Sequence, residues 1–150
     1  MAPEVQSTIL TLPYSSDVAD GAMPAEEMEI LEEAQPDLPK DVASLRLELV
    51  PFLGEGETYV DGSELAKRAK DLKIGFARRL SQFLRQSQGT ILKDWRRFCL
   101  AFPDLVFKDE RGDRRILSLN WKEKEQTWQI GLRWLDRRWG HFTRLVRLVQ

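Results

Sequence analysis

The sequence is poor in the side chains that most catalytic and metal centres need. Its 150 residues include one cysteine, Cys99, and one histidine, His141. A single cysteine excludes an internal disulfide bond, and one cysteine with one histidine cannot complete a structural zinc site. One histidine near the C-terminus also gives no convincing Ser/His/Asp or Cys/His set. The sequence therefore predicts a protein that is not an enzyme and that binds no cofactor and no metal ion.

Membrane segments and phosphate-binding loops are missing as well. No stretch approaches the roughly 18 consecutive apolar residues that indicate a membrane-spanning helix. The N-terminus lacks the basic and apolar regions of a secretory signal, which predicts a cytoplasmic location. Gly54-Glu55-Gly56 is followed by Glu57, and these acidic side chains would repel a phosphate group.

Charge is unevenly distributed along the chain, although the net charge is only −1. Residues 1–57 carry two basic and thirteen acidic side chains, which gives −11, and residues 58–150 carry twenty-one basic and eleven acidic, which gives +10. Residues 1–40 are also rich in proline and poor in large apolar side chains, so they are predicted to form a disordered acidic arm. Within this arm, residues 7–12 favour a short strand or a binding peptide, and residues 25–34 favour a short acidic helix.

The periodicity of residues 41–120 predicts a mainly α domain with one small β-hairpin. Residues 41–53 show both helical spacing and strict alternation, and we expect a helix there rather than a strand. A short β-prone stretch at 58–60 precedes a helix that Ser63 can cap. Two further helices are expected over 76–88 and 90–102, of which the last ends at a proline.

The hairpin follows directly after this last helix. Residues 105–107 and 116–119 are apolar and flank a charged turn that contains Gly112. Glycine suits a turn that needs a positive φ, so the pattern is typical of two paired strands.

The C-terminal segment, residues 121–150, is predicted to be an added amphipathic helix. From residue 127 to 149 its apolar side chains recur at alternating spacings of three and four. Such a helix packs either on the domain or on a protein partner. The candidate partner-binding residues on its apolar stripe are Trp128, Leu132, Leu135, Trp139 and Phe142.

Two stretches of the chain resemble the LOTUS (OST-HTH) type of domain within the winged-helix superfamily. The first is Tyr59-Val60-Asp61-Gly62-Ser63-Glu64-Leu65, which enters a helix. The second is residues 92–102 followed by Pro103-Asp104-Leu105-Val106-Phe107. The resemblance covers about half of the chain, and the long basic third helix and the added C-terminal helix depart from it. It implies a winged-helix domain that binds RNA or DNA, or docks onto another protein, and has no catalytic role.

Arginine on successive predicted helices and at the hairpin is the strongest functional signal. In residues 58–150, fourteen arginines accompany seven lysines. Arginine binds phosphate oxygens bidentately, and clustered cations gain affinity from counterion release. The sequence therefore predicts a small regulatory protein that binds nucleic acid, RNA or DNA. The candidate nucleic-acid-binding residues are Arg78, Arg79, Arg85, Lys93, Arg96, Arg97, Arg111, Arg114 and Arg115.

Three other uses of these features stay open at the level of the sequence. A charged outer face also keeps a helix soluble without binding anything. The protein can instead be an interaction adaptor or a homodimer that uses the C-terminal stripe and the N-terminal segments. The acidic arm can also mimic nucleic acid and occupy a basic face of its own domain or of a partner.

Overall fold

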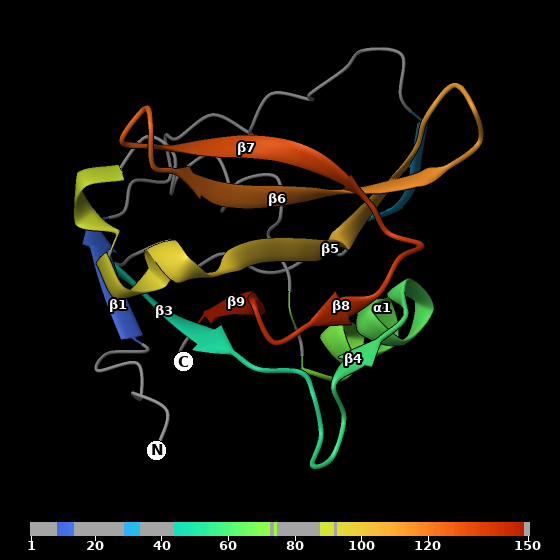
Figure 1. Cartoon of the computed structure of the whole chain (residues 1–150), viewed down its shortest axis with the longest axis horizontal. Helices are drawn as coiled ribbons and strands as arrows, with labels where there is room; N and C mark the ends of the chain where they lie inside the picture. The colour runs from blue at the N-terminus through green and yellow to red at the C-terminus, as the bar shows by residue number, and fades with distance from the viewer. Residues whose placement is uncertain are drawn as a thin grey trace.

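The computed structural model describes residues 9–13, 29–33, 44–72, 74, 88–91 and 93–148, and within them the chain is mostly β (Figure 1). Seven strands belong to one mixed sheet: β1 (Ile9–Pro13), β2 (Glu29–Glu33), β3 (Ser44–Val50), β5 (Cys99–Lys108), β6 (Arg114–Lys122), β7 (Thr127–Trp134) and β9 (Thr143–Leu148). The strand order is β1-β3-β9-β5-β6-β7, and β2 also pairs with β5. A two-stranded sheet is formed by β4 (Tyr59–Val60) and β8 (Trp139–Gly140). The helical elements are α1 (Gly62–Asp71) and the 3-10 helices η1 (Gln88–Thr90) and η2 (Lys93–Arg97).

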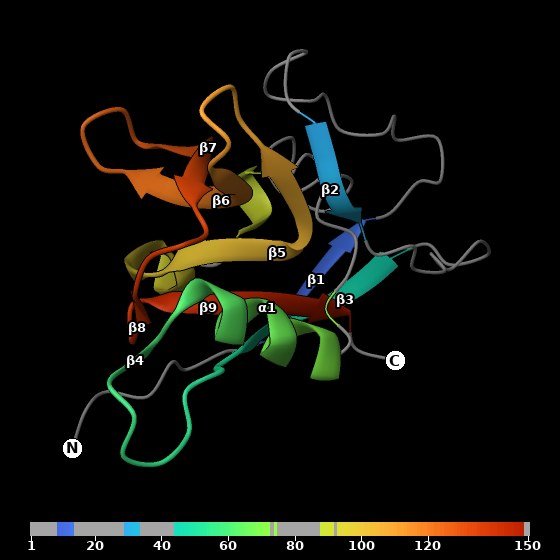
Figure 2. The ribbon, with the colours of Figure 1, turned by 90° about the vertical axis from the view of Figure 1, so that its right-hand side faces the viewer.

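Strand β5 is the centre of the sheet and bends along its length, as Figure 2 shows. Its first half pairs with β6 and, in parallel, with β9, whereas its second half pairs with β6 and β2. The register shifts between Phe102 and Val106, where Pro103 has no N–H to donate to a neighbouring strand. An irregularity at a proline lets one strand change direction without leaving a ladder donor unpaired.

The two faces of the sheet bury separate apolar clusters. Alternation along the strands places Leu100, Leu117 and Leu119 in one cluster, together with Trp95 from η2. The opposite face carries Ala101 and the other apolar cluster, which α1 covers with Leu65 and Ala69.

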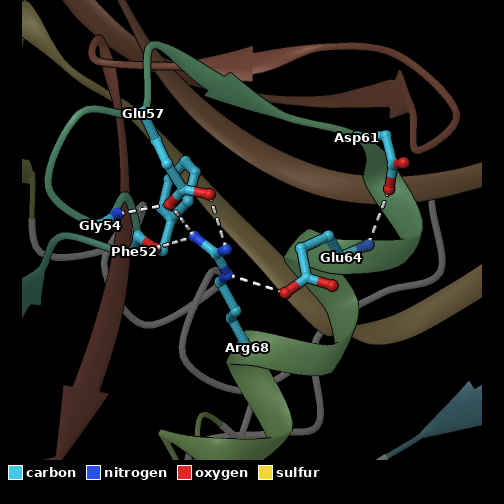
Figure 3. Close-up of polar contacts among 6 residues, drawn as sticks. All are labelled: Phe52, Gly54, Glu57, Asp61, Glu64 and Arg68. Carbon is cyan, nitrogen blue, oxygen red and sulfur yellow. Dashed lines mark hydrogen bonds and ion pairs between the residues drawn. The ribbon is translucent and has the colours of Figure 1, made fainter.

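An ion-pair network ties α1 to the segment between β3 and β4 (Figure 3). Both oxygens of the Glu57 carboxylate accept hydrogen bonds from the guanidinium of Arg68, at 2.5 and 2.9 Å. Arg68 also donates to Glu64 at 3.0 Å and to the carbonyl of Phe52 at 2.8 Å. The hydrogen bonds that Glu57 accepts from Arg68 and, to a smaller extent, from the N–H of Gly54 lower its pKa to about 2.

The prediction of a mainly α fold is wrong. The segment predicted as a C-terminal helix forms β7, β8 and β9, and the segment from 41 to 53 contains β3. The predicted helix over 90–102 is instead short 3-10 turns followed by the start of β5. Since α1 is the one α-helix in the described ranges, no winged-helix arrangement is present there. The physical reason is that alternate side chains of a strand lie on opposite faces of the sheet, so pairing with strands distant in the sequence decides which of them are buried.

Several local predictions are confirmed. The short strand at 58–60 is β4, the helix after it is α1, and the hairpin of β5 and β6 turns through Gly112 at a φ of 86°. The helix is capped by Asp61 rather than by Ser63, since the Asp61 carboxylate accepts from the N–H of Glu64 at 2.9 Å.

The N-terminal region contributes to the sheet as well. Strands β1 and β2 fall within the predicted acidic arm, and they pair with β3 and β5. The predicted helix over 76–88 lies outside the described residues. No helix in the described part of the chain is long and apolar enough to cross a membrane.

Candidate anion-binding pocket

A pocket of about 270 Å³ lies beside the first residues of β5. Its walls come from η2, from the ends of β6 and β7, and from the turn between β8 and β9. Cys99, Asn120 and Thr143 supply polar wall groups from three different strands. The sheet register explains this convergence, because Cys99 and Thr143 are partners in the parallel pairing of β5 with β9.

Four arginines line the pocket: Arg96, Arg97, Arg133 and Arg137. None of the described residues that line it is acidic or a lysine. Arg144 adds a fifth guanidinium nearby, 4.4 Å from the ring centroid of Phe98, and the guanidinium of Arg97 lies 4.9 Å from the same ring. Burial lowers the pKa of Arg144, and the positive charge of Arg97 lowers it further. The described walls of the pocket therefore bring four guanidinium groups together and contain no carboxylate.

Aromatic rings and amides, rather than carboxylates, hold several of these arginines. The guanidinium of Arg96 lies 3.8 Å from the ring centroid of Trp121, and that of Arg137 lies 5.1 Å from the ring centroid of Trp139. Arg133 donates to the side-chain oxygen of Asn120 at 3.1 Å. The buried Nε of Arg96 has no hydrogen-bond partner. A cation held by stacking keeps its charge available to an incoming anion.

Glu123 is an acidic side chain whose pKa is affected by Arg96, one of the pocket arginines. Its pKa is lowered, mainly by the hydrogen bond that the indole N–H of Trp121 donates at 2.6 Å, and to a smaller extent by the charges of Arg96 and Lys93. Glu123 is exposed and does not line the pocket. It orients Trp121 beneath Arg96 and leaves the interior of the pocket cationic.

Phe142 gives the pocket an exposed aromatic edge. Its side chain lines the pocket and is 77% exposed, which is the largest exposure among the large apolar side chains in the described residues. The carbonyl of Phe142 accepts the N–H of Cys99 at 2.7 Å, which fixes the turn against the start of β5. An exposed ring beside clustered cations suits stacking with a planar group that carries negative charge.

Cys99 is the one cysteine of the chain, and it lines the pocket. Burial raises the pKa of the Cys99 thiol, although the charges of Arg133 and Arg137 act in the opposite direction. A thiol with a raised pKa is mostly protonated near neutral pH and is a poor nucleophile. Among the described residues, no group of three or more His, Cys, Asp or Glu side chains comes together in a way that could hold a metal ion.

The arginines of the hairpin are placed differently from those of the pocket. Arg114 forms an ion pair with Asp136, and Arg115 forms one with Asp109 at 2.9 Å. These bonds lower the pKa values of both carboxyl groups. Arg111 is exposed at the tip of the hairpin. The three side chains lie at the opposite end of β6 from the pocket, so they do not extend its cationic lining.

Those of the nine predicted nucleic-acid-binding residues that the structure describes lie in different parts of it. Arg96 and Arg97 line the pocket, and Lys93 is exposed on the same 3-10 helix. Arg78, Arg79 and Arg85 lie outside the described residues. Arg133, Arg137 and Arg144 were missed as site residues, because a helical reading of 127–149 scatters them over other faces.

The candidate partner-binding residues differ in how far they are buried. Trp128, Leu135 and Trp139 are buried in the apolar clusters, and Leu132 packs against one of them. Phe142 is the member of this set that the solvent reaches most. The apolar stripe predicted for a helix is therefore distributed between the core and the edge of the pocket.

The fold and the pocket define the protein as a mainly β protein with an arginine-lined, aromatic-edged cavity. Comparison with known protein families, with curated proteins and with solved structures finds no match to this chain, so the winged-helix and LOTUS resemblance gains no support.

Proposed function

We propose that this protein binds single-stranded nucleic acid through the arginine pocket and Phe142. The observation that carries the proposal is a cavity whose described lining has four arginines and no acidic side chain, with an exposed phenyl ring at its edge. Arginine forks match the geometry of phosphate oxygens, and an aromatic face stacks on any base. Both halves of a nucleotide therefore find complementary groups at one site.

A single strand fits this surface better than a duplex does. Bases inside a duplex are stacked on one another and cannot reach an aromatic side chain, whereas unpaired bases can. The arginines also lie in a recess, and the described residues that form it belong to strands, to the 3-10 helix η2 and to turns rather than to a projecting helix. A recess of this kind accepts one nucleotide at a time more readily than the phosphate backbone of a duplex.

The division of roles follows from position. Arg96, Arg97, Arg133 and Arg137 would contact phosphate oxygens, and Phe142 would stack on a base. The paired arginines Arg114 and Arg115 contribute less, because each already faces a carboxylate.

A salt titration of binding tests the proposal. The affinity for a fluorescent 12-nucleotide single strand, as RNA and as DNA, is measured by anisotropy between low and moderate salt, with the matching duplex as a third ligand. Four phosphate contacts predict a slope of log K against log salt of about −3. No measurable binding to either single strand at low salt, or binding to the duplex that is tighter than to both strands, would refute the proposal.

Substitution of Phe142 separates stacking from charge. Phe142→Ala should weaken single-strand binding by roughly 1–3 kcal/mol and leave the salt slope unchanged, because no phosphate contact is lost. Trp134→Ala is the matched control, since Trp134 is also an exposed aromatic that lies against an arginine, Arg115, but it does not line the arginine pocket. Equal losses in the two variants would contradict the placement of the site.

A further inference from the structure

Several guanidinium groups converge on the arginine pocket, which suits a ligand group that carries more than one negative charge. Arg96, Arg97, Arg133 and Arg137 line a volume of about 270 Å³, and Arg144 adds its charge from beside Phe98. An internal phosphodiester carries one negative charge on two free oxygens. A phosphomonoester carries between about −1.5 and −2 near neutral pH and presents three acceptor oxygens. The second group matches a convergent set of guanidinium forks more closely.

The size and shape of the pocket favour the same group. A volume of about 270 Å³ lies at or below the lower end of the range of about 300–1,000 Å³ that is typical of small-ligand sites. A space of this size accommodates the end of a strand. Phe142 at the edge is then in reach of the base that belongs to the bound phosphate.

We propose that the arginine pocket binds a terminal phosphomonoester, so that the protein recognises the phosphorylated end of a single strand. The inference rests on the proposed nucleic-acid binding and names the part of the ligand that the pocket selects. The arginines surround the terminal phosphate, and Phe142 stacks on the terminal base. The remainder of the strand leaves past Phe142 toward solvent.

Three versions of one fluorescent oligonucleotide test the proposal with the unmodified protein. They carry a 5′-phosphate, a 3′-phosphate, or hydroxyl groups at both ends. We expect one phosphorylated version to bind about tenfold or more tightly than the hydroxyl version, because the extra charge and oxygen add charge-assisted hydrogen bonds. Equal affinity for all three would overturn end recognition and leave the proposed function in place. No binding of any version would overturn the proposed function itself.

The pH dependence gives a readout that general charge attraction does not produce. The second ionisation of a phosphomonoester has a pKa of about 6, whereas an internal phosphodiester does not titrate between pH 5 and 8. The preference for the phosphorylated end should therefore grow as the pH rises from 5 to 7.5. A preference that is constant over this range would contradict recognition of the terminal group.

Two adjacent arginines provide a matched pair of variants. Arg137 lines the pocket beside Trp139, whereas Arg138 lies against Tyr59 and does not line it. Both are exposed, and both substitutions remove one positive charge. Arg137→Gln should abolish most of the preference for the phosphorylated end, and Arg138→Gln should retain it. If both variants retained the full preference, the pocket would not be the site.

Competition separates the two sources of a phosphomonoester. A nucleoside 5′-monophosphate and inorganic phosphate are titrated against the bound phosphorylated strand. The mononucleotide is compared with the unlabelled phosphorylated strand by the concentration that each needs to displace the bound strand. Similar concentrations would support phosphomonoester binding and identify the free nucleotide as a sufficient ligand. Displacement only by the phosphorylated strand would support recognition of a strand end. Displacement by the hydroxyl strand as effectively as by the phosphorylated strand would overturn the inference.

Discussion

Gly62→Ala should destabilise the protein, because Gly62 lies against the backbone that supports the pocket. A Cβ atom at this first residue of α1 would lie 1.8 Å from the carbonyl oxygen of Leu135 and 2.5 Å from its carbonyl carbon. The Leu135 oxygen accepts the indole N–H of Trp139 at 2.9 Å and the backbone N–H of Arg137 at 2.8 Å. The carbonyl therefore cannot retreat from a new methyl group without breaking one of these bonds.

The size of the effect follows from three contributions. Inserting a carbon into a filled space costs roughly 1–3 kcal/mol. Losing a buried hydrogen bond at the Leu135 oxygen adds about 1–3 kcal/mol, and the better helix propensity of alanine returns at most about 1 kcal/mol. The middle of each range gives a net loss of about 3 kcal/mol. For a chain of this size each kcal/mol corresponds to about 2–4 °C, so the melting temperature should fall by roughly 6–12 °C.

Thermal unfolding followed by circular dichroism measures this loss. Gly131→Ala and Gly89→Ala are the controls, because a Cβ at Gly131 meets only the Ser118 hydroxyl at 3.6 Å and a Cβ at Gly89 meets nothing within 4 Å. Both controls should unfold within about 2 °C of the parent protein, as near-neutral substitutions do. A Gly62→Ala variant as stable as the two controls would refute the close approach of α1 to Leu135.

Two further predictions concern ionisable groups. Glu57→Gln should lower the melting temperature at neutral pH. The difference in melting temperature from the parent protein should narrow as the pH falls from about 4.5 to about 2, because the lowered pKa of Glu57 means that its pairing with Arg68 is lost only in that window. Glu55→Gln, at an exposed neighbour, is the control, and a difference that does not depend on pH would contradict the pairing of Glu57 with Arg68. Cys99 should react with iodoacetamide at pH 8 far more slowly than a free thiol does, and its own rate should increase at higher pH, because burial raises its pKa. Reaction at the rate of a free thiol would contradict the burial of Cys99.

The parts of the fold that the sequence predicts correctly are those with a local cause. The turn between β5 and β6 contains Gly112, whose φ of 86° is the left-handed conformation that glycine tolerates best. The helix α1 has apolar residues at helical spacing, although Asp61 caps it rather than the predicted Ser63. Each of these signals operates within a few residues, so no knowledge of distant partners is needed to read it.

The C-terminal region shows why a helical period can mislead. Trp128 and Leu132 are four residues apart, which suits a helix, but Ile130 lies between them and packs against the same apolar cluster. The alternation of Trp128, Ile130 and Leu132 with Gln129 and Gly131 is the pattern of a strand with one buried face. Gly131 within the segment also disfavours a helix, and it lies where β7 pairs with β6. A short segment can satisfy both periods, and sheet partners distant in the sequence decide between them.

Arginine content alone could not locate the candidate site, because the tertiary structure decides which guanidinium groups are neutralised. Arg114 and Arg137 cannot be told apart from the sequence, yet Arg114 pairs with Asp136, whereas Arg137 lies over the Trp139 ring at a pocket whose described walls contain no acidic side chain. Asp136 is adjacent to Arg137 in the chain and still pairs with a residue 22 positions away. Stacking rather than ion pairing is thus what leaves positive charge concentrated at the pocket. A search for anion sites in β-rich proteins should accordingly consider which group each arginine contacts. An arginine stacked on an aromatic ring keeps its positive charge available to an anion, whereas a carboxylate partner neutralises that charge.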